Sequence, residues 1–141
     1  MAKVNWVRED FSSVKKAADR GNKHAAYELG MRYLTGRGVE ANAEVGLDWV
    51  RYAARRQHMK AQELLGFCLV RGVGAAPDGV SAVKWFQRAA RQGSSVALFN
   101  LGCCYLVGIG LPRSSRAARI YFASAADKGY KKGAAALAVL S

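Results

Sequence analysis

The chain has 141 residues, of which 51% are hydrophobic, and it contains only two prolines. This length suits one ordinary domain, and a chain so rich in apolar residues can bury enough surface to exclude disorder. Lysine and arginine number 22 against 10 acidic residues, which gives a formal net charge of +12. A field of this sign attracts anionic partners.

No apolar run approaches the roughly 20 residues that span a bilayer. The first residues, MAKVNWVREDF, contain no uninterrupted apolar core and no small-residue cleavage site, so no signal peptide is expected. Cys68, Cys103 and Cys104 form no CxxC motif and no Cys/His cluster with metal-ligand spacing. We therefore expect three reduced, largely buried thiols in a cytoplasmic protein, and no metal site.

Residues 1–21 carry apolar side chains at helical spacing, namely Val4, Val7, Phe11, Val14 and Ala18. Side chains three and four residues apart lie on the same face of a helix. The pattern predicts a single helix that caps the front of the domain.

From residue 22 onward the sequence repeats every 36 residues without a gap, and one column contains Leu29, Leu65, Leu101 and Leu137. Such a period is the signature of a repeat architecture. The frame predicts one repeat domain over residues 1–141, with repeats at 22–57, 58–93 and 94–129 and a half repeat at 130–141. Other recurrent columns contain the glycines Gly30, Gly66 and Gly102, the glycines Gly36, Gly72 and Gly108, and the aromatic residues Trp49, Trp85 and Tyr121.

The middle repeat shows why each unit forms two helices. Residues 61–70 have apolar side chains three and four apart, which predicts a first helix. Gly66 interrupts it at a cost of up to about 1 kcal/mol relative to alanine, so we expect a neighbouring helix to approach closely there. Gly72 suits a helix C-terminus and Asp78 suits the N-cap of the second helix. The buried stripe predicted for that second helix contains Val80, Val83, Phe86, Ala89 and Ala90, and Trp85 is expected to contribute the largest packing area.

These units predict an all-α fold, a right-handed α-solenoid of antiparallel helix pairs with about eight helices. The middle repeat, AQELLGFCLVRGVGAAPDGVSAVKWFQRAARQG, resembles the Sel-one-like repeat, a relative of the tetratricopeptide repeat. The signature of that repeat is A-x-x-x-L-G-x-x-Y, then G-x-G, an aspartate, K-A-x-x-W and A-A-x-x-G. Leu69, Gly46 and Gln57 depart from it, at a tyrosine, an alanine and a glycine position. The resemblance covers essentially the whole chain and implies an adaptor that organises protein complexes, although the fold alone names no activity.

Nothing in the sequence forms a catalytic constellation. The G-x-G pairs recur in every repeat and follow no strand, so we interpret them as turns and not as a phosphate loop. His24 and His58, the only histidines, stand near the starts of first helices without a nucleophile motif, and we expect them to be solvated. The sequence predicts a protein that is not an enzyme and uses no cofactor.

Two surfaces are candidates for binding. In tetratricopeptide-like solenoids the first helices line the concave side, and carrying over the inward positions selects a largely apolar row that Val139 would extend. This row suits an apolar or amphipathic peptide from another protein, which is the leading hypothesis, and the competing interpretation is that these side chains belong to the core. The row consists of Tyr27, Met31, Leu34, Glu63, Phe67, Val70, Phe99, Cys103 and Leu106.

The second surface is basic. Residues 71–141 contain ten lysines and arginines against the two acids Asp78 and Asp127. The alternative hypothesis is therefore a module that binds nucleic acid or another anionic surface, and the competing interpretation is a solvated face that keeps the protein soluble. The residues concerned are Lys84, Arg88, Arg91, Arg113, Arg116 and Arg119.

The ending GAAALAVLS begins a further repeat and has no charge after Lys132. The outer side of a terminal solenoid helix is normally polar. We therefore expect this helix either to tuck against the third repeat or to meet a second copy, giving weak self-association.

Overall fold

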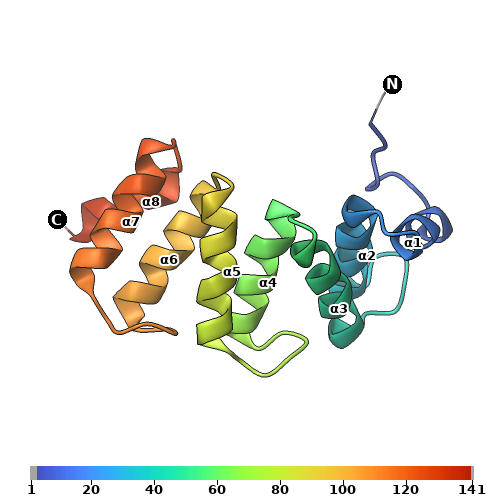
Figure 1. The fold of residues 1–141 in the computed structure, drawn as a ribbon, viewed down its shortest axis with the longest axis horizontal. Coiled ribbons are helices and arrows are strands. Elements are labelled where there is room, and N and C mark those ends of the chain that lie inside the picture. Colours follow the sequence, from blue (N-terminus) through green and yellow to red (C-terminus); the bar gives the residue numbers. More distant parts are fainter. Residues whose placement is uncertain (1–2, 141) are drawn as a thin grey trace.

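The computed structural model describes residues 3–140, and within this range it contains eight helices and no strand. The helices follow one another along a single axis, and each packs mainly against its neighbours in the chain. Figure 1 shows the resulting elongated solenoid, with the N-terminus at one end and the C-terminus at the other. The all-α solenoid predicted from the sequence is confirmed. Its elements are α1 (Phe11–Asp19), α2 (Lys23–Thr35), α3 (Ala43–Arg55), α4 (Met59–Arg71), α5 (Gly79–Arg91), α6 (Ser95–Val107), α7 (Ser115–Asp127) and α8 (Lys131–Leu140).

Within the repeats, the helix ends fall where the sequence predicted them. In the middle repeat α4 ends at Gly72, whose φ of 75° is left-handed, a conformation that glycine adopts without a steric penalty. α5 begins after Asp78, whose carboxylate accepts a hydrogen bond from the backbone N–H of Ser81 at 3.1 Å. The corresponding residues of the other repeats act in the same way: Gly36 and Gly108 as C-caps, Asn42 and Ser114 as N-caps.

The glycine inside each first helix makes room for the second helix. A Cβ on Gly66 would lie 2.5 Å from the ring of Phe86, and a Cβ on Gly102 would lie 2.6 Å from the ring of Phe122. Carbon atoms in contact are normally 3.5–4.0 Å apart, so the close approach predicted from the repeated glycine is confirmed. The object approached in these two repeats is an aromatic ring.

In the first repeat a valine, Val50, occupies the position of Phe86, and the two helices approach through their backbones. A Cβ on Gly30 would lie 2.9 Å from the carbonyl oxygen of Gly46, and a Cβ on Gly46 would lie 2.9 Å from that of Gly30. Gly46 departs from the usual alanine because no side chain fits there.

The aromatic column at Trp85 contributes less to the core than the sequence suggested. Trp85 is only half-buried, whereas Phe86 is 2% exposed. Val80 was expected in the buried stripe, and its 56% exposure shows that this expectation was wrong. One residue corresponds to 100° of rotation around a helix, so the neighbour of a core residue lies at the edge of the interface. There Trp85 stacks under the Arg88 guanidinium, 4.5 Å from its ring centroid.

The N-terminal helix is shorter than predicted. It begins at Phe11 after the N-cap Asp10, and Val4 and Val7, expected on its apolar face, are 53% and 60% exposed. Residues 1 and 2 of the predicted helix lie outside the described range. The physical reason for the late start is Arg32, whose guanidinium donates hydrogen bonds to backbone carbonyl groups of the preceding segment. In a helix these carbonyl groups would accept from backbone N–H groups instead.

Gln57 is the one residue other than glycine with a positive φ in the described range, at 66°. It closes the turn between α3 and α4, where the other repeats have a glycine with φ of 97°, 97° or 86°. A side chain in this conformation costs roughly 1–2 kcal/mol, so the departure from the repeat pattern carries local strain.

Candidate binding surfaces

The apolar row on the first helices is neither fully buried nor fully open. None of its nine residues is buried, and Phe67 is 47% exposed. Phe67 and Val70 of α4 and Cys103 of α6 line one hollow of about 150 Å³ between these helices. Arg71 stands at its rim, with its guanidinium 5.3 Å from the centroid of the Phe67 ring. Three of the nine predicted residues, Phe67 included, therefore line the same hollow.

In each first helix, the row member nearest the N-terminus of the helix contacts the following repeat or half repeat. Tyr27 stacks on His58 with ring centroids 4.7 Å apart, and Glu63 accepts a hydrogen bond from the Ser94 hydroxyl at 2.5 Å. Phe99 contacts the aromatic ring that precedes α8, at 5.5 Å between centroids. Tyr27, Glu63 and Phe99 therefore already have partners inside the solenoid. Met31, Leu34 and Leu106 are half-buried and do not line the hollow at Phe67.

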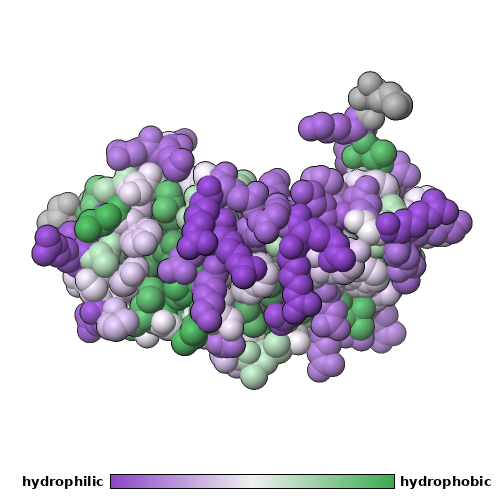
Figure 2. Space-filling view, viewed as in Figure 1, coloured by the Kyte–Doolittle hydropathy of each residue, from purple (hydrophilic) through white to green (hydrophobic). Residues whose placement is uncertain are grey.

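The six basic residues named from the sequence are all exposed. None of them forms an ion pair within the described part of the chain. Figure 2 shows long hydrophilic side chains lying across the face of the molecule over α5. Arg119 differs from the others because it donates a hydrogen bond to the carbonyl oxygen of Leu140 at 2.7 Å, which ties α7 to the end of α8.

A cavity of about 630 Å³ lies at the N-terminal end of the solenoid and was not predicted. It is bounded by the non-helical residues 3–7 and by the starts of α2 and α4. Its lining combines basic, apolar and aromatic side chains, chiefly Lys3, Lys23, Lys60, His24, His58, Val4, Trp6, Val7, Tyr27 and Met59.

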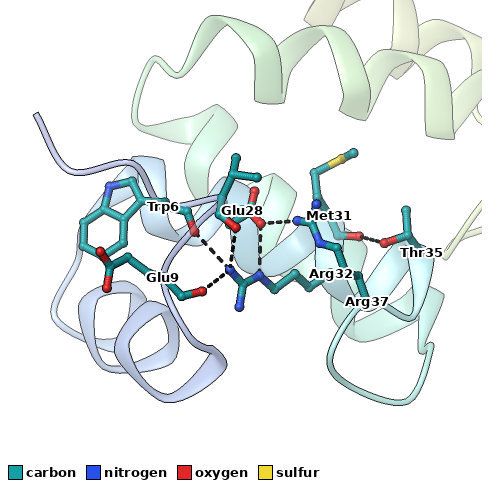
Figure 3. Close-up of polar contacts among 8 residues, drawn as sticks. Trp6, Glu9, Glu28, Met31, Arg32, Thr35 and Arg37 are labelled. Carbon is teal, nitrogen blue, oxygen red and sulfur yellow. Dashed lines mark hydrogen bonds and ion pairs between the residues drawn. The ribbon is translucent and has the colours of Figure 1, made fainter.

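A buried ion pair holds the wall of this cavity in place. Glu28 and Arg32 are each 5% exposed, and Arg32 Nε lies 3.0 Å from Glu28 Oε1. The Nη2 atom of Arg32 donates to the carbonyl oxygens of Trp6 at 3.0 Å and Glu9 at 2.5 Å, and Arg37 also pairs with Glu28. Figure 3 shows the guanidinium between the Glu28 carboxylate and the N-terminal segment. A charge buried this deeply is stable only with such partners.

His58 forms part of the cavity and is not the solvated residue that we expected. It is half-buried and is the N-cap of α4, where Nδ1 accepts a hydrogen bond from the backbone N–H of Ala61 at 3.1 Å. Burial first, and then the nearby charges of His24, Lys23 and Lys60, lower its pKa to about 4. The ring is therefore neutral at pH 7, and because Nδ1 accepts, its proton is on Nε2. His24 is exposed, as expected.

One signal in the sequence could have revealed the role of His58. It occupies the same column of the repeat as Asn22 and Ser94, and both of these are N-cap residues. No comparable signal exists for the cavity, because Arg32 reaches carbonyl groups 23 to 26 residues away in the chain.

The three cysteines are free, as predicted, and Cys68 and Cys104 are buried. Burial raises the pKa of all three thiols, in the case of Cys104 to about 11. Thiols with raised pKa values are poor nucleophiles at neutral pH. Within residues 3–140 no group of histidine, cysteine and acidic side chains could hold a metal ion.

The repeat family follows from a comparison with known sequences. The Sel1 repeat matches residues 23–58, 60–94 and 95–130. The chain belongs to the Sel1 repeat family. Sel1 repeat proteins are generally non-catalytic scaffolds for protein interactions. None of the described helices is long and apolar enough to cross a membrane, and no curated protein matches the sequence significantly.

Solved structures of Sel1 repeat proteins superpose on the chain. A Sel1 repeat protein from Oxalobacter formigenes is 31% identical with a TM-score of 0.84, over 92% of this chain and 98% of that one. A protective antigen present in uropathogenic Escherichia coli strains is 34% identical with a TM-score of 0.81, over 84% of this chain and 25% of that one. Helicobacter pylori cysteine rich protein B, at 15% identity and a TM-score of 0.69 over 93% and 94%, shares the fold alone.

Proposed function

We propose that this Sel1 repeat protein is a non-catalytic scaffold that binds an apolar or amphipathic segment of a partner protein around Phe67. The observation that supports the proposal is the exposure of this ring, 47%, beside the hollow between α4 and α6. Burying a phenylalanine completely is worth about 1.5–3 kcal/mol. A partner that covers the exposed half of Phe67 would therefore gain roughly 1 kcal/mol from this residue alone.

The surroundings of Phe67 indicate the kind of segment that fits. Val70, Cys103 and Ile109 make the hollow apolar, while Arg71 and Asn100 give it a polar rim. An apolar anchor with a polar rim is the usual composition of an interface. A segment with an apolar side chain for the hollow and an acidic side chain for Arg71 would match both.

Selection of binding peptides from a random display library would test the proposal. Phe67→Ala should weaken the selected peptides by about fivefold, which corresponds to roughly 1 kcal/mol, and Phe67→Leu should restore much of their affinity. Val80→Ala removes a similarly exposed apolar side chain on α5 and should leave affinity unchanged, which makes it the matched control. Equal affinities for wild type and Phe67→Ala, with native helical content in both, would remove Phe67 from the site. Phe99 is unsuitable for this purpose because it packs against Phe122.

The alternative function, binding of nucleic acid or another anionic surface, is supported by the six exposed basic residues without an ion-pair partner in the described chain. Such binding weakens steeply with salt, with a slope set by the number of phosphates contacted. Replacing Lys84, Arg88 and Arg91 by glutamine should then lower both affinity and slope. Salt-independent binding, or none at low ionic strength, would argue against this function.

Self-association through α8 remains a prediction. Val139 on this helix is 84% exposed, and Ile120 on the adjacent α7 is 59% exposed. Isolated copies could bury these side chains against each other. Sedimentation at high concentration should show a dimer that Val139→Asp abolishes, and a strictly monomeric profile would refute the prediction.

A further inference from the structure

The cavity at the N-terminal end of the solenoid has an uncompensated positive charge. Lys3, Lys23 and Lys60 line it, and none of them has an ion-pair partner among the described residues. The only acidic residue in its lining is Glu28, which is already paired with Arg32 and Arg37. A concave site with one sign of charge concentrates ligands of the opposite sign. An anion would therefore be the complementary occupant.

The same cavity has an apolar and aromatic wall. Val4 and Val7 are 53% and 60% exposed, and Trp6, Tyr27 and Met59 lie beside them in the lining. Aromatic side chains offer flat surfaces against which a flat ligand can stack. The volume of about 630 Å³ falls within the roughly 300–1,000 Å³ of typical small-molecule sites. The ligand that fits such a wall has an apolar body as well as a negative charge.

We propose that this cavity binds a small aromatic carboxylate, a ligand site separate from the peptide surface at Phe67. The aromatic body would lie against Trp6 and Tyr27, and the carboxylate would face the lysines. His58 adds a neutral Nε2–H donor, because its Nδ1 is occupied by the Ala61 backbone N–H. A carboxylate can accept hydrogen bonds from several such donors at once.

Two features favour a small molecule over a nucleic acid or an extended acidic protein. The lysines are gathered around one cavity, whereas a phosphate backbone requires cations spread along a track. The cavity wall is also fixed in advance, since the buried Arg32 guanidinium holds the carbonyls of Trp6 and Glu9. A preformed site loses little conformational entropy on binding.

The experiment compares 2-naphthoate with its neutral analogue 2-naphthamide by isothermal titration calorimetry on the full chain. The two probes have the same aromatic body and differ in charge, so naphthoate should bind at least tenfold more tightly. The double variant Lys23→Gln/Lys60→Gln should reduce naphthoate to the affinity of the amide. The control Lys84→Gln/Arg88→Gln removes two cations from α5 and should leave the difference intact.

Several results would overturn the proposal. Equal affinity of the two probes, or naphthoate binding that survives in the Lys23→Gln/Lys60→Gln variant, would show that the lysines do not recognise the carboxylate. Inorganic phosphate that competes as well as naphthoate would show that the aromatic wall contributes nothing. An acidic peptide that binds there while naphthoate does not would assign the cavity to a protein partner. Peptides selected on Phe67 should bind the lysine variant normally, so the two proposals can fail independently.

Discussion

The glycine column inside the first helices allows a test of how this solenoid is packed, and Gly66→Ala is the decisive change. A Cβ at this position would lie 2.5 Å from Cε1, 2.7 Å from Cδ1 and 2.8 Å from Cζ of Phe86. Normal carbon contacts are about 3.5–4.0 Å, so the ring would have to move by about 1 Å. Phe86 is 2% exposed and therefore has no free space into which it can turn.

The magnitude follows from two opposing effects. Overfilling a packed core costs about 1–3 kcal/mol, and a displacement of this size on three ring atoms belongs in the upper part of that range. Replacing glycine by alanine inside a helix returns up to about 1 kcal/mol. We therefore expect Gly66→Ala to lower the free energy of unfolding by about 1–2 kcal/mol, although alanine is the better helix former.

Urea unfolding followed by circular dichroism would measure this loss, and two further variants isolate its cause. In a Phe86→Leu background the Gly66→Ala substitution should cost much less, because the clashing ring atoms are gone. Ala138 occupies the same column in α8 and is exposed, so Ala138→Gly should be mildly destabilising, by up to about 1 kcal/mol. The reasoning is refuted if Gly66→Ala matches the wild type in stability, or if its cost is the same with leucine at position 86.

Two predictions concern the turn before α4. Gln57→Gly should raise the free energy of unfolding by about 0.5–1 kcal/mol in urea unfolding, because glycine adopts the left-handed backbone at φ 66° without strain, although it adds some chain entropy to the unfolded state. Arg56→Gly is the control, since φ is −97° there. It should bring no gain, and a gain would refute the explanation. His58 has its pKa lowered from 6.5 to about 4 in the folded protein, so between these values the unfolded chain binds a proton that the folded chain does not. Stability should therefore fall as pH drops through this window, and His58→Asn, which keeps an N-cap acceptor, should flatten the dependence; parallel curves for the two proteins would contradict this assignment.

Much of the fold could be predicted because the same local signals for helix ends and close contacts recur in each of the three repeats. Gly72 and Asp78 end and begin helices through their own backbone and side-chain chemistry, and both were placed correctly. Gly66 was recognised as a close contact because a costly residue recurred at one position. Local rules of this kind need no knowledge of the neighbouring helices.

The parts that could not be predicted depend on contacts between segments far apart in the chain. Val4 and Val7 have helical spacing, yet the Arg32 guanidinium donates to the carbonyls of Trp6 and Val7, and residues 6–8 form a turn and not a helix. Spacing reports only which side chains would share a face if a helix formed. It carries no information about a buried cation that offers the same carbonyls a stronger partner.

The sequence by itself therefore determined the repeat, the helix boundaries within the repeats and the column of glycines. These features depend on local conformation and on a pattern that recurs in three repeats. Only the tertiary structure decided which side chains are available to a ligand. The exposed ring of Phe67 lies beside a hollow between α4 and α6, and the cavity at Lys23 and Lys60 exists because Arg32 fixes the N-terminal segment across the starts of two helices. Both surfaces are properties of packed neighbours, and a linear pattern does not encode how closely those neighbours approach.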